Sequence, residues 1–376
     1  MAFAFTEEQE QFRDIVARFL RDTSPTVEVR RLMETDAGFD AAVWDRLNRE
    51  LGLSAVHIPE AFGGQGFSFV ELGIVCEEMG RALLCAPYFS SAVLGADAIL
   101  QAGSPDRKAE LLPSLATGER RGALAVTEPA GGWGTGAVET VARRNGAAYR
   151  IDGAKSFVID GHTADLIVVV AREPGSVGQE GISFFTVAGD AAGLDRQLLD
   201  TVDPTRKMAR LTFRNVPAEP LGEPGAGAPA LERILVGAVT ALASEMVGGA
   251  QQMLDSAIDY TKLRMQFGRP IGSFQAVKHK CADMLLEVEL AKSAAYQAAS
   301  AVADGAADAP ALASLAKAAA SDTYLRAAAD CIQLHGGIGF TWDNDTHLWF
   351  KRAKSSEVLF GDATHHRERM LEHWPE

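Results

Sequence analysis

The chain has 376 residues, of which 47% are apolar and 23% are charged, a composition typical of a soluble globular protein. This length is too great for one compact core and predicts two or three packed units. The formal net charge of −14 argues against a nucleic-acid-binding surface and against a polybasic membrane patch.

The cysteines and the first residues indicate in which cellular compartment the protein is expected. Four cysteines are scattered without any C-x-x-C pair, which argues against a zinc site or a disulfide framework. The first residues, "MAFAFTEEQEQF", are acidic where a signal peptide would be basic, and no apolar run approaches the length of a membrane span. We therefore expect a cytoplasmic protein without a metal site.

Helical and strand patterns divide the chain into three parts, which predict an α+β fold. Residues 1–119 show apolar positions at helical spacing, and Thr6 and Gln9 have the spacing of a capping box at the first helix. Residues 120–230 contain short strand-like segments without long helices between them, so we expect a middle domain built as an antiparallel barrel or sandwich. Residues 231–376 return to long Ala-rich helices with short connections, which predict a four-helix bundle.

Three glycine-containing stretches could carry function. "GGWGTGA" (131–137) superficially matches a dinucleotide fingerprint, but a strand-like segment follows it, so we interpret it as a flexible loop over a ligand. In "LRMQFGRPIGSFQ" (263–275), Arg264 could pair with a phosphate and Gln275 could hydrogen-bond a polar cofactor edge, although a plain corner between two helices explains the same residues. "QLHGGIGF" (333–340) either lets a backbone approach a ligand closely or simply ends a helix at glycine.

Together, "RMQFGRPIGSFQ", "HGGIGF", "PEAFGGQG" and "TEPA" resemble, in order and separation, the motifs of the acyl-CoA dehydrogenase family. The resemblance covers essentially the whole chain. It implies FAD, an acyl-CoA substrate from fatty-acid or sterol side-chain catabolism, an electron acceptor such as electron-transfer flavoprotein, and a homotetramer or heterotetramer. The implied reaction is oxidation of the thioester to the α,β-enoyl-CoA with hydride transfer to the flavin.

The resemblance also implies roles for individual residues. Thr127 would lie against the flavin ring, and the loop around Trp133 would approach the substrate. Phe157 stands where many members have the Trp of a Trp-x-Thr motif, so an aromatic wall is kept, but Ile159 replaces the Thr. The resemblance further implies that Arg264, Phe267 and Gln275 contact FAD bound mainly by a neighbouring subunit. It also implies that Gln333, Gly336 and Gly337 line the adenosine pyrophosphate of that FAD.

The base that removes the α-proton is missing from both positions at which the family places it. Counted from Gly336, the usual Glu position is Phe360, and the second family position, counted back from Arg264, is Ala238. Glu245, in an otherwise apolar helix, is our first candidate for a relocated base. The alternative is a buried Glu paired with a cation of a neighbouring helix.

Two further acids and two histidines lie near these positions. Asp362 is a weaker candidate for the base, because it is also placed to cap the next helix, and Glu232 is expected at the surface. His365 and His366 are neighbours in that helix, so they face different ways and are expected to be solvated or paired with Asp362.

Three hypotheses follow from the missing base. The chain could be a dehydrogenase with a relocated base, or a subunit without a base in a heteromeric dehydrogenase. It could also catalyse a different flavin reaction on the same fold, as a monooxygenase or a desulfinase-like enzyme.

Overall fold

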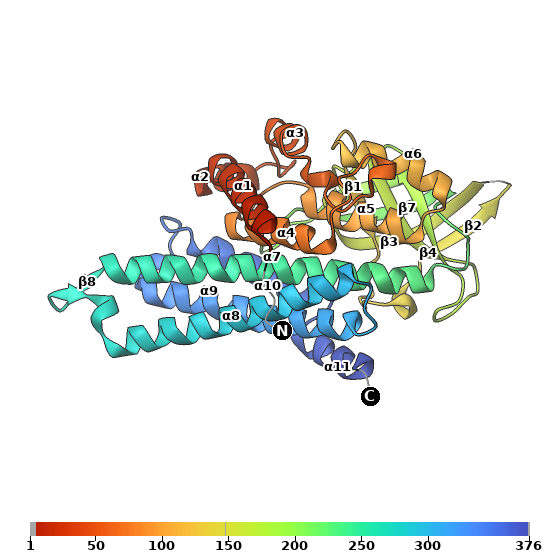
Figure 1. Ribbon diagram of the computed structural model, residues 1–376. Coiled ribbons are helices and arrows are strands. Elements are labelled where there is room, and N and C mark those ends of the chain that lie inside the picture. Colours follow the sequence, from red (N-terminus) through yellow and green to blue (C-terminus); the bar gives the residue numbers. More distant parts are fainter. Residues whose placement is uncertain (1–4, 147, 375–376) are drawn as a thin grey trace. The chain divides into compact units, whose positions relative to one another are not determined.

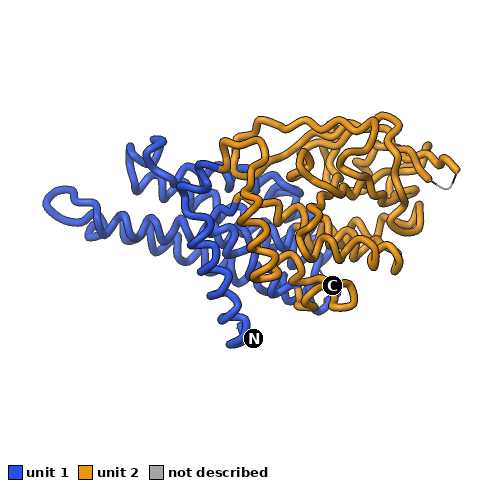
Figure 2. The backbone as a smooth tube through the Cα atoms, turned by 90° about the horizontal axis from the view of Figure 1, so that it is seen from above, with its two compact units in different colours: residues 1–31, 69–84, 239–376 blue, residues 32–68, 85–238 orange. Residues whose placement is uncertain are grey.

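The computed structural model describes residues 5–146 and 148–374, which fall into two compact units. The first unit contains residues 1–31, 69–84 and 239–376, and the second contains residues 32–68 and 85–238 (Figure 2). Each unit joins segments that are far apart in the sequence. Two of the four boundaries between the units fall inside helices, at residues 31/32 and 238/239.

The first unit is helical and carries one short hairpin (Figure 1). Its α-helices are α1 (Glu7–Thr23), most of α2 (Thr26–Met33), α4 (Phe69–Ala82), most of α7 (Ala228–Leu263), α8 (Gln275–Ala303), α9 (Ala309–His335), α10 (Thr346–Val358) and α11 (Ala363–His373). Between α7 and α8 lie β8 (Met265–Gln266), β9 (Arg269–Pro270) and the 3₁₀ turn η5 (Ile271–Ser273), and η6 (Gly336–Phe340) follows α9.

Local sequence signals explain several helix ends. The predicted capping box is confirmed, because the Thr6 side chain accepts from Gln9 N and the Gln9 side chain accepts from Thr6 N. The helical C-terminal part is also confirmed. After three long helices the chain continues in two shorter ones, α10 and α11, which are separated by a turn at residues 359–362 and both pack against α9.

Glycine allows α4 and α7 to pack very closely. A Cβ at Gly80 would lie 1.9 Å from the backbone oxygen of Glu245, and one at Gly248 would lie 1.8 Å from the backbone oxygen of Glu77. Any side chain at either position would therefore force the two helices apart. This crossing fixes the environment of Glu245.

The second unit contains a seven-stranded sheet with short helices beside it in the chain. Its strands are β1 (Gly122–Ala125), β2 (Val141–Asn145), β3 (Ala148–Ile159), β4 (Leu166–Arg172), β5 (Ile182–Ala188), β6 (Leu194–Leu198) and β7 (Met208–Pro220). Its helices are α3 (Ala41–Arg49), η1 (Leu53–Ala55), η2 (Glu60–Phe62), the π-helix η3 (Phe89–Gly95), α5 (Ala96–Ala102), α6 (Pro105–Ala116) and η4 (Thr135–Ala137).

The strand pairings close into a ring in the order β4, β5, β7, β3, β2 and back to β4, with β1 added to β4 and β6 added to β7. The predicted barrel is thereby confirmed, but its purely antiparallel character is wrong. β1 runs parallel to β4, and β2 meets β4 through one parallel pair, Val141 with Arg172. The reason is that the β2–β3 hairpin is inserted between β1 and β4, so the chain returns beside β1 in the same direction.

The inside of the barrel is apolar. Ile151, Val169, Phe185 and Leu211, from four different strands, are fully buried in one cluster. The expected loop at 131–137 contains only the short turn η4 and leads into β2, so no helix follows it. This loop therefore lacks the strand–turn–helix context of a Rossmann-type site, as the sequence predicts.

Candidate functional site

The hairpin after α7 presents an aromatic side chain to solvent. Phe267 and Gly268, between β8 and β9, both have left-handed backbone conformations, with φ of 52° and 77°. Such a pair forms the two-residue turn that suits the twist of a hairpin. The Phe267 side chain is 90% exposed as a result, which is unusual for phenylalanine and makes it available to a ligand or a second subunit.

The glycine loop after α9 lies near the same end of α7 as this hairpin. Tyr260, one turn before Arg264, stacks on His335 with ring centroids 4.1 Å apart, and its hydroxyl donates to the His335 carbonyl oxygen at 3.3 Å. α9 ends at His335, and Gly336 follows as its C-cap with a φ of 67°. The predicted helix end is thus confirmed, and the structure brings Arg264 and Gly336 to one end of the helical unit.

The surface at this end suits a phosphate-bearing ligand. The side chains of Arg264, Gln275 and Gln333 are exposed and make no hydrogen bond or ion pair within the part of the chain that the structure describes. A Cβ at Gly336 or Gly337 would meet nothing within 4 Å. A guanidinium, two amides and an open glycine backbone fit the diphosphate and adenosine of FAD.

Two other predicted cofactor residues meet in the second unit. Ser156 N donates to the Thr127 carbonyl oxygen at 2.8 Å, which places Thr127 beside the residue before Phe157. The register of β3 against β7 shifts between Lys155 and Val158, and within this bulge Phe157 has a φ of 55° and a side chain that is 54% exposed. The bulge therefore turns an aromatic ring out of the sheet next to Thr127.

A buried ion pair that the sequence analysis missed supports this arrangement. The fully buried Lys155 donates from Nζ to Glu128 Oε1 at 2.7 Å and to the Val126 carbonyl oxygen at 2.9 Å. Glu128 Oε1 also accepts from Thr140 N at 2.8 Å. These bonds hold the segment that carries Thr127 against β3. Glu128 and Lys155 are 27 positions apart, and no local pattern links them.

Burial and pairing act in opposite directions on this pair. Burial lowers the pKa of Lys155 to about 8, although Glu128 opposes the shift. For Glu128, burial alone would raise the pKa, but the attraction of Lys155 and the accepted hydrogen bonds hold it below its usual value. Both groups are therefore charged near neutral pH.

Glu245, the first candidate for the base, is held in a buried ion pair. Its Oε1 accepts from Arg352 Nη1 of α10 at 3.1 Å, and both side chains are buried. α4 covers it, since Gly80 packs directly on the backbone of Glu245. The alternative considered above, a buried Glu paired with a cation of a neighbouring helix, is what the structure shows. The role of Glu245 as a base stays a prediction.

The turn that carries Phe360 is fastened from two sides. Phe360 has a φ of 59°, and its carbonyl oxygen accepts from His366 Nε2 at 3.1 Å. Lys317 Nζ donates to the carbonyl oxygens of Glu357 and Gly361, both at 3.0 Å. Burial lowers the pKa of Lys317 to about 8. This buried clamp has no signature in the sequence.

The structure confirms the expectation for Asp362 and contradicts the one for His366. The predicted cap is confirmed, because Asp362 Oδ1 accepts from His365 N at 2.8 Å at the start of α11. The expected solvation of both histidines is wrong for His366, which is 2% exposed and contacts Ser314 Oγ through Nδ1 at 3.3 Å. Burial lowers the pKa of His366 to about 3, so this ring is neutral at physiological pH.

The described residues contain neither a cluster suited to a metal ion nor a helix suited to cross a membrane. Within residues 5–146 and 148–374, no three His, Cys, Asp or Glu side chains are grouped so that they could hold a metal ion. None of the described helices combines the length and apolar character needed to cross a membrane.

Comparison with known proteins extends these observations to the whole chain. Residues 6–119, 123–216 and 225–374 match the N-terminal, middle and C-terminal domains of acyl-CoA dehydrogenase, respectively. The chain is 35% identical to acyl-CoA dehydrogenase IpdE2 of Mycobacterium tuberculosis over 94% of this chain and 93% of the relative.

Solved structures agree in fold. Butyryl-CoA dehydrogenase of Megasphaera elsdenii superposes with a TM-score of 0.92 at 27% identity, covering 99% of both chains. The ChsE4–ChsE5 complex of Mycobacterium tuberculosis gives a TM-score of 0.89 at 27% identity, covering 100% of both chains. Since all three domains match in order over nearly the whole length, the chain belongs to the acyl-CoA dehydrogenase family.

Proposed function

We propose that this chain oxidises an acyl-CoA thioester to the α,β-enoyl-CoA as an FAD-dependent flavoprotein. The observation that carries the proposal is the match of all three family domains, together with exposed, unpaired polar side chains where a dinucleotide would lie. FAD, when bound, supplies the acceptor for the hydride of the substrate. The chain itself binds and orients both molecules.

The residues divide this work between them. Arg264 and Gln275 would contact FAD bound mainly by a neighbouring subunit, and the backbone at Gly336 and Gly337 would lie against the adenosine diphosphate part of that FAD. Thr127 and the exposed ring of Phe157 would contact the flavin ring. The buried Lys155 and Glu128 keep Thr127 in place beside the bulge.

Removal of the α-proton needs a side chain that accepts it. Phe360 has no proton acceptor in its side chain. Asp362 uses one oxygen as the cap of α11. Glu245 remains the candidate, although its pairing with Arg352 means that it must give up part of that contact to act as a base.

The test is anaerobic titration of the purified flavoprotein with a panel of acyl-CoAs while the flavin absorbance is followed. We expect bleaching of the flavin by at least one acyl-CoA. If Glu245 is the base, Glu245→Gln slows the reductive step by at least about 100-fold, whereas Asp362→Asn and the exposed control Asp259→Asn leave it within about threefold of the original chain.

A second candidate function is a subunit without its own base in a heteromeric dehydrogenase. It is favoured by Phe360 at the usual base position and by the buried ion pair of Glu245. One solved structure with this fold, the ChsE4–ChsE5 complex, contains two different components. In this case Glu245→Gln has no effect on the reductive step, and activity appears only when the chain is co-expressed with a partner of the same fold.

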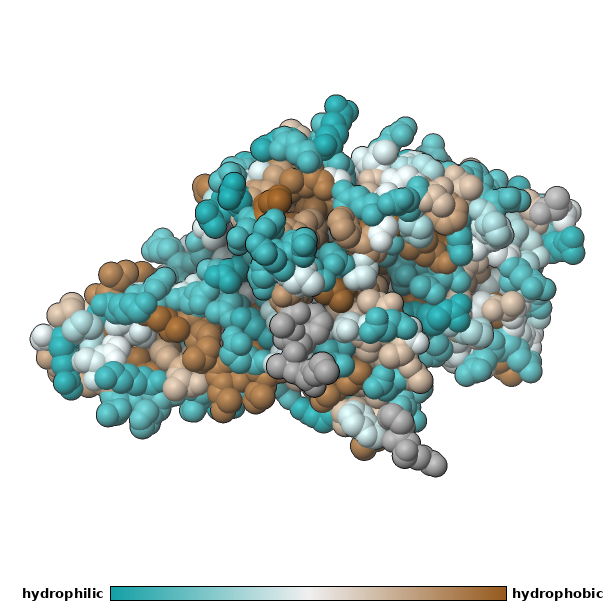
Figure 3. Space-filling model, viewed as in Figure 1, coloured by the Kyte–Doolittle hydropathy of each residue, from teal (hydrophilic) through white to brown (hydrophobic). Residues whose placement is uncertain are grey.

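The assembly and the electron acceptor also belong to the proposal. We expect a homotetramer or a heterotetramer, because apolar surface gathers over α8, where Leu285, Leu286 and Leu290 are 47%, 61% and 62% exposed (Figure 3). Family membership supports electron-transfer flavoprotein as the acceptor that reoxidises the cofactor.

A further inference from the structure

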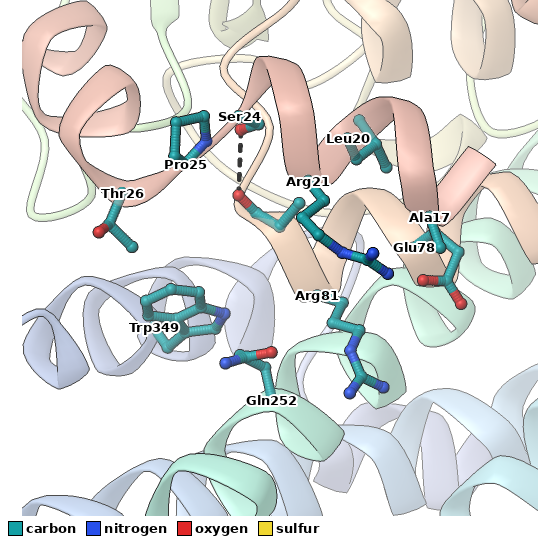
Figure 4. A pocket seen from close by; sticks show the side chains of 11 residues that line it. Ala17, Leu20, Arg21, Ser24, Pro25, Thr26, Glu78, Arg81, Gln252 and Trp349 are labelled. Atoms are coloured by element: carbon teal, nitrogen blue, oxygen red, sulfur yellow. Dashed lines mark hydrogen bonds between the residues drawn. The ribbon is translucent and has the colours of Figure 1, made fainter. Parts of the chain in front are cut away.

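One cavity of the first unit lies apart from the residues discussed above, but its charged groups need no ligand (Figure 4). It measures about 290 Å³ and is lined mainly by residues of α1, α4, α7 and α10. Glu78 is paired with Arg13, and Arg81 is paired with Asp255. Arg21 is exposed to solvent. These charges are therefore satisfied by protein partners or by water.

The second unit contains a buried arginine that joins two loops. Arg172 is the last residue of β4 and is 8% exposed. Its Nη2 donates to the carbonyl oxygen of Thr135 at 3.1 Å and to that of Gly178 at 2.8 Å. Its Nη1 donates to the carbonyl oxygen of Ser176 at 2.6 Å. One guanidinium therefore fastens the 131–137 loop to the connection between β4 and β5.

No carboxylate balances the charge of Arg172. Its three acceptors are backbone oxygens, and it forms no ion pair within residues 5–146 and 148–374. Besides burial, the positive charge of Arg172 lowers the pKa of Lys155, so a second buried cation lies near it. Burying a guanidinium costs free energy, which its hydrogen bonds offset, and an apolar side chain would avoid that cost. Stability alone is thus a poor explanation for this residue.

The side chain of Arg172 holds the outer part of the 131–137 loop, because other contacts already anchor the base of that loop. Thr140 N donates to Glu128 Oε1 at 2.8 Å, and the Thr140 carbonyl oxygen accepts from Arg172 N at 2.9 Å. The guanidinium acts on Thr135, two residues after Trp133. Loss of this side chain would therefore release the outer part and leave the base in place.

This outer part is open to a ligand. A Cβ at Gly131, Gly134 or Gly136 would meet nothing within 4 Å. The backbone N–H groups of Gly132, Gly134 and Gly136 donate no hydrogen bond to any residue that the structure describes. Free N–H groups in such a loop suit the oxygens of a phosphate. The CoA part of the proposed substrate carries phosphates of this kind.

We propose that Arg172 is a positioning residue for the acyl-CoA substrate. Through the Thr135 carbonyl oxygen it holds the 131–137 loop in the conformation that contacts the CoA part. Arg172 acts through this loop, because its buried guanidinium is directed at backbone oxygens. The inference rests on the proposed function. It predicts that loss of Arg172 weakens substrate binding more than it slows reduction of the flavin at saturation.

Isothermal titration calorimetry of the intact flavoprotein tests this role, with coenzyme A as the probe because every acyl-CoA contains it. Arg172→Met removes all the donors, and we expect it to weaken binding of coenzyme A at least about tenfold. Arg172→Lys keeps a charge and donors but lacks the planar fork that spans both loops, so it recovers only part of the affinity.

Arg150→Met is the matched control. Arg150 Nη1 donates to the carbonyl oxygen of Asn215 at 3.2 Å, so this arginine also holds a backbone oxygen in the same sheet, outside the 131–137 loop. We expect Arg150→Met to leave the affinity for coenzyme A unchanged.

Hydrogen exchange separates positioning from folding. We expect the amides of residues 131–137 to exchange at least about tenfold faster in Arg172→Met, while those of β3 exchange as in the original chain. If Arg172→Met does not fold, Arg172→Lys decides the question, and we expect it to bind coenzyme A at least about threefold more weakly than the original chain.

The inference is overturned if the folded Arg172 variants bind coenzyme A as tightly as the original chain. It is also overturned if coenzyme A does not bind the original chain, or if Arg150→Met weakens binding as much as Arg172→Met does. Absence of flavin bleaching by every acyl-CoA would contradict the proposed reaction instead, because binding of coenzyme A is measured without turnover.

Discussion

Single buried charges decide much of the behaviour of this molecule at the residue scale. Lys155 and Glu128 lie inside the second unit, where each charge is tolerated only because the other is there. Removing one partner leaves an uncompensated charge in a place that water does not reach. Removing both charges destabilises the fold less, because no uncompensated charge stays buried.

Lys155→Met is therefore expected to lower the free energy of unfolding by about 3–5 kcal/mol, measured by urea denaturation at pH 7. The double change Lys155→Met with Glu128→Gln is expected to recover a substantial part of that loss. If the double variant were no more stable than the single one, the pair would not be the source of the effect.

Asp97 gives a pH-dependent prediction. It is 6% exposed, and burial raises its pKa to about 7 from an ordinary 3.8, although a hydrogen bond from Gln101 and the nearby Arg233 oppose the shift. Between these two values the unfolded chain has lost the proton and the folded chain keeps it. Its contribution to stability therefore falls as the pH rises from about 4 to about 7.

Asp97→Asn removes this dependence. We expect the variant to unfold at a higher urea concentration than the original chain at pH 8, and to differ little from it at pH 4.5. The gain at pH 8 is at most a few kcal/mol, since each unit of pKa shift corresponds to about 1.4 kcal/mol. Equal stability of the two chains at pH 8 would contradict the assignment.

At the scale of elements, the crossing of α4 and α7 depends on glycine. Two glycines on α4 face α7 but differ in the room around them. At Gly80 an added Cβ would lie 1.9 Å from the backbone oxygen of Glu245, whereas at Gly73 its nearest neighbour is the Ser244 hydroxyl at 3.3 Å. A backbone oxygen cannot move without its helix, but a hydroxyl can rotate.

Gly80→Ala is accordingly expected to lower the free energy of unfolding by about 2–3 kcal/mol. Gly73→Ala is expected to change it by no more than about 1 kcal/mol, because alanine also favours the helix. Thermal unfolding followed by circular dichroism compares the two. A similar loss in both variants would show that the crossing is looser than its geometry indicates.

The turn between α10 and α11 shows which contacts can be predicted from local sequence and which cannot. Asp362 as a helix cap follows from its position before the helix and its side-chain chemistry. The clamp by Lys317 and His366 joins residues of α9 and α11 to that turn, and its partners are backbone oxygens. Backbone acceptors leave no trace in the residue types, so this contact could not be predicted.

For the whole molecule, the exposed leucines of α8 indicate that a single chain is not the final assembly. Leucine buried at an interface contributes up to about 2 kcal/mol, so three on one helix favour association. Leu290→Glu is expected to lower the molar mass measured by light scattering after size-exclusion chromatography. Val177→Glu, at an isolated apolar residue that is 71% exposed, is the control and leaves the mass unchanged.

The sequence by itself determined the family and the order of helical, β and helical parts. These follow from periodicity, glycine positions and motif spacing, which are properties of neighbouring residues. Only the tertiary structure decided that Glu245 is paired with Arg352, that Lys155 is paired with Glu128, and that two strand pairings are parallel. The reason is physical: a buried charge or a strand edge takes its partner from whatever the fold brings near, and that partner lies 27 to 107 positions away in the two ion pairs.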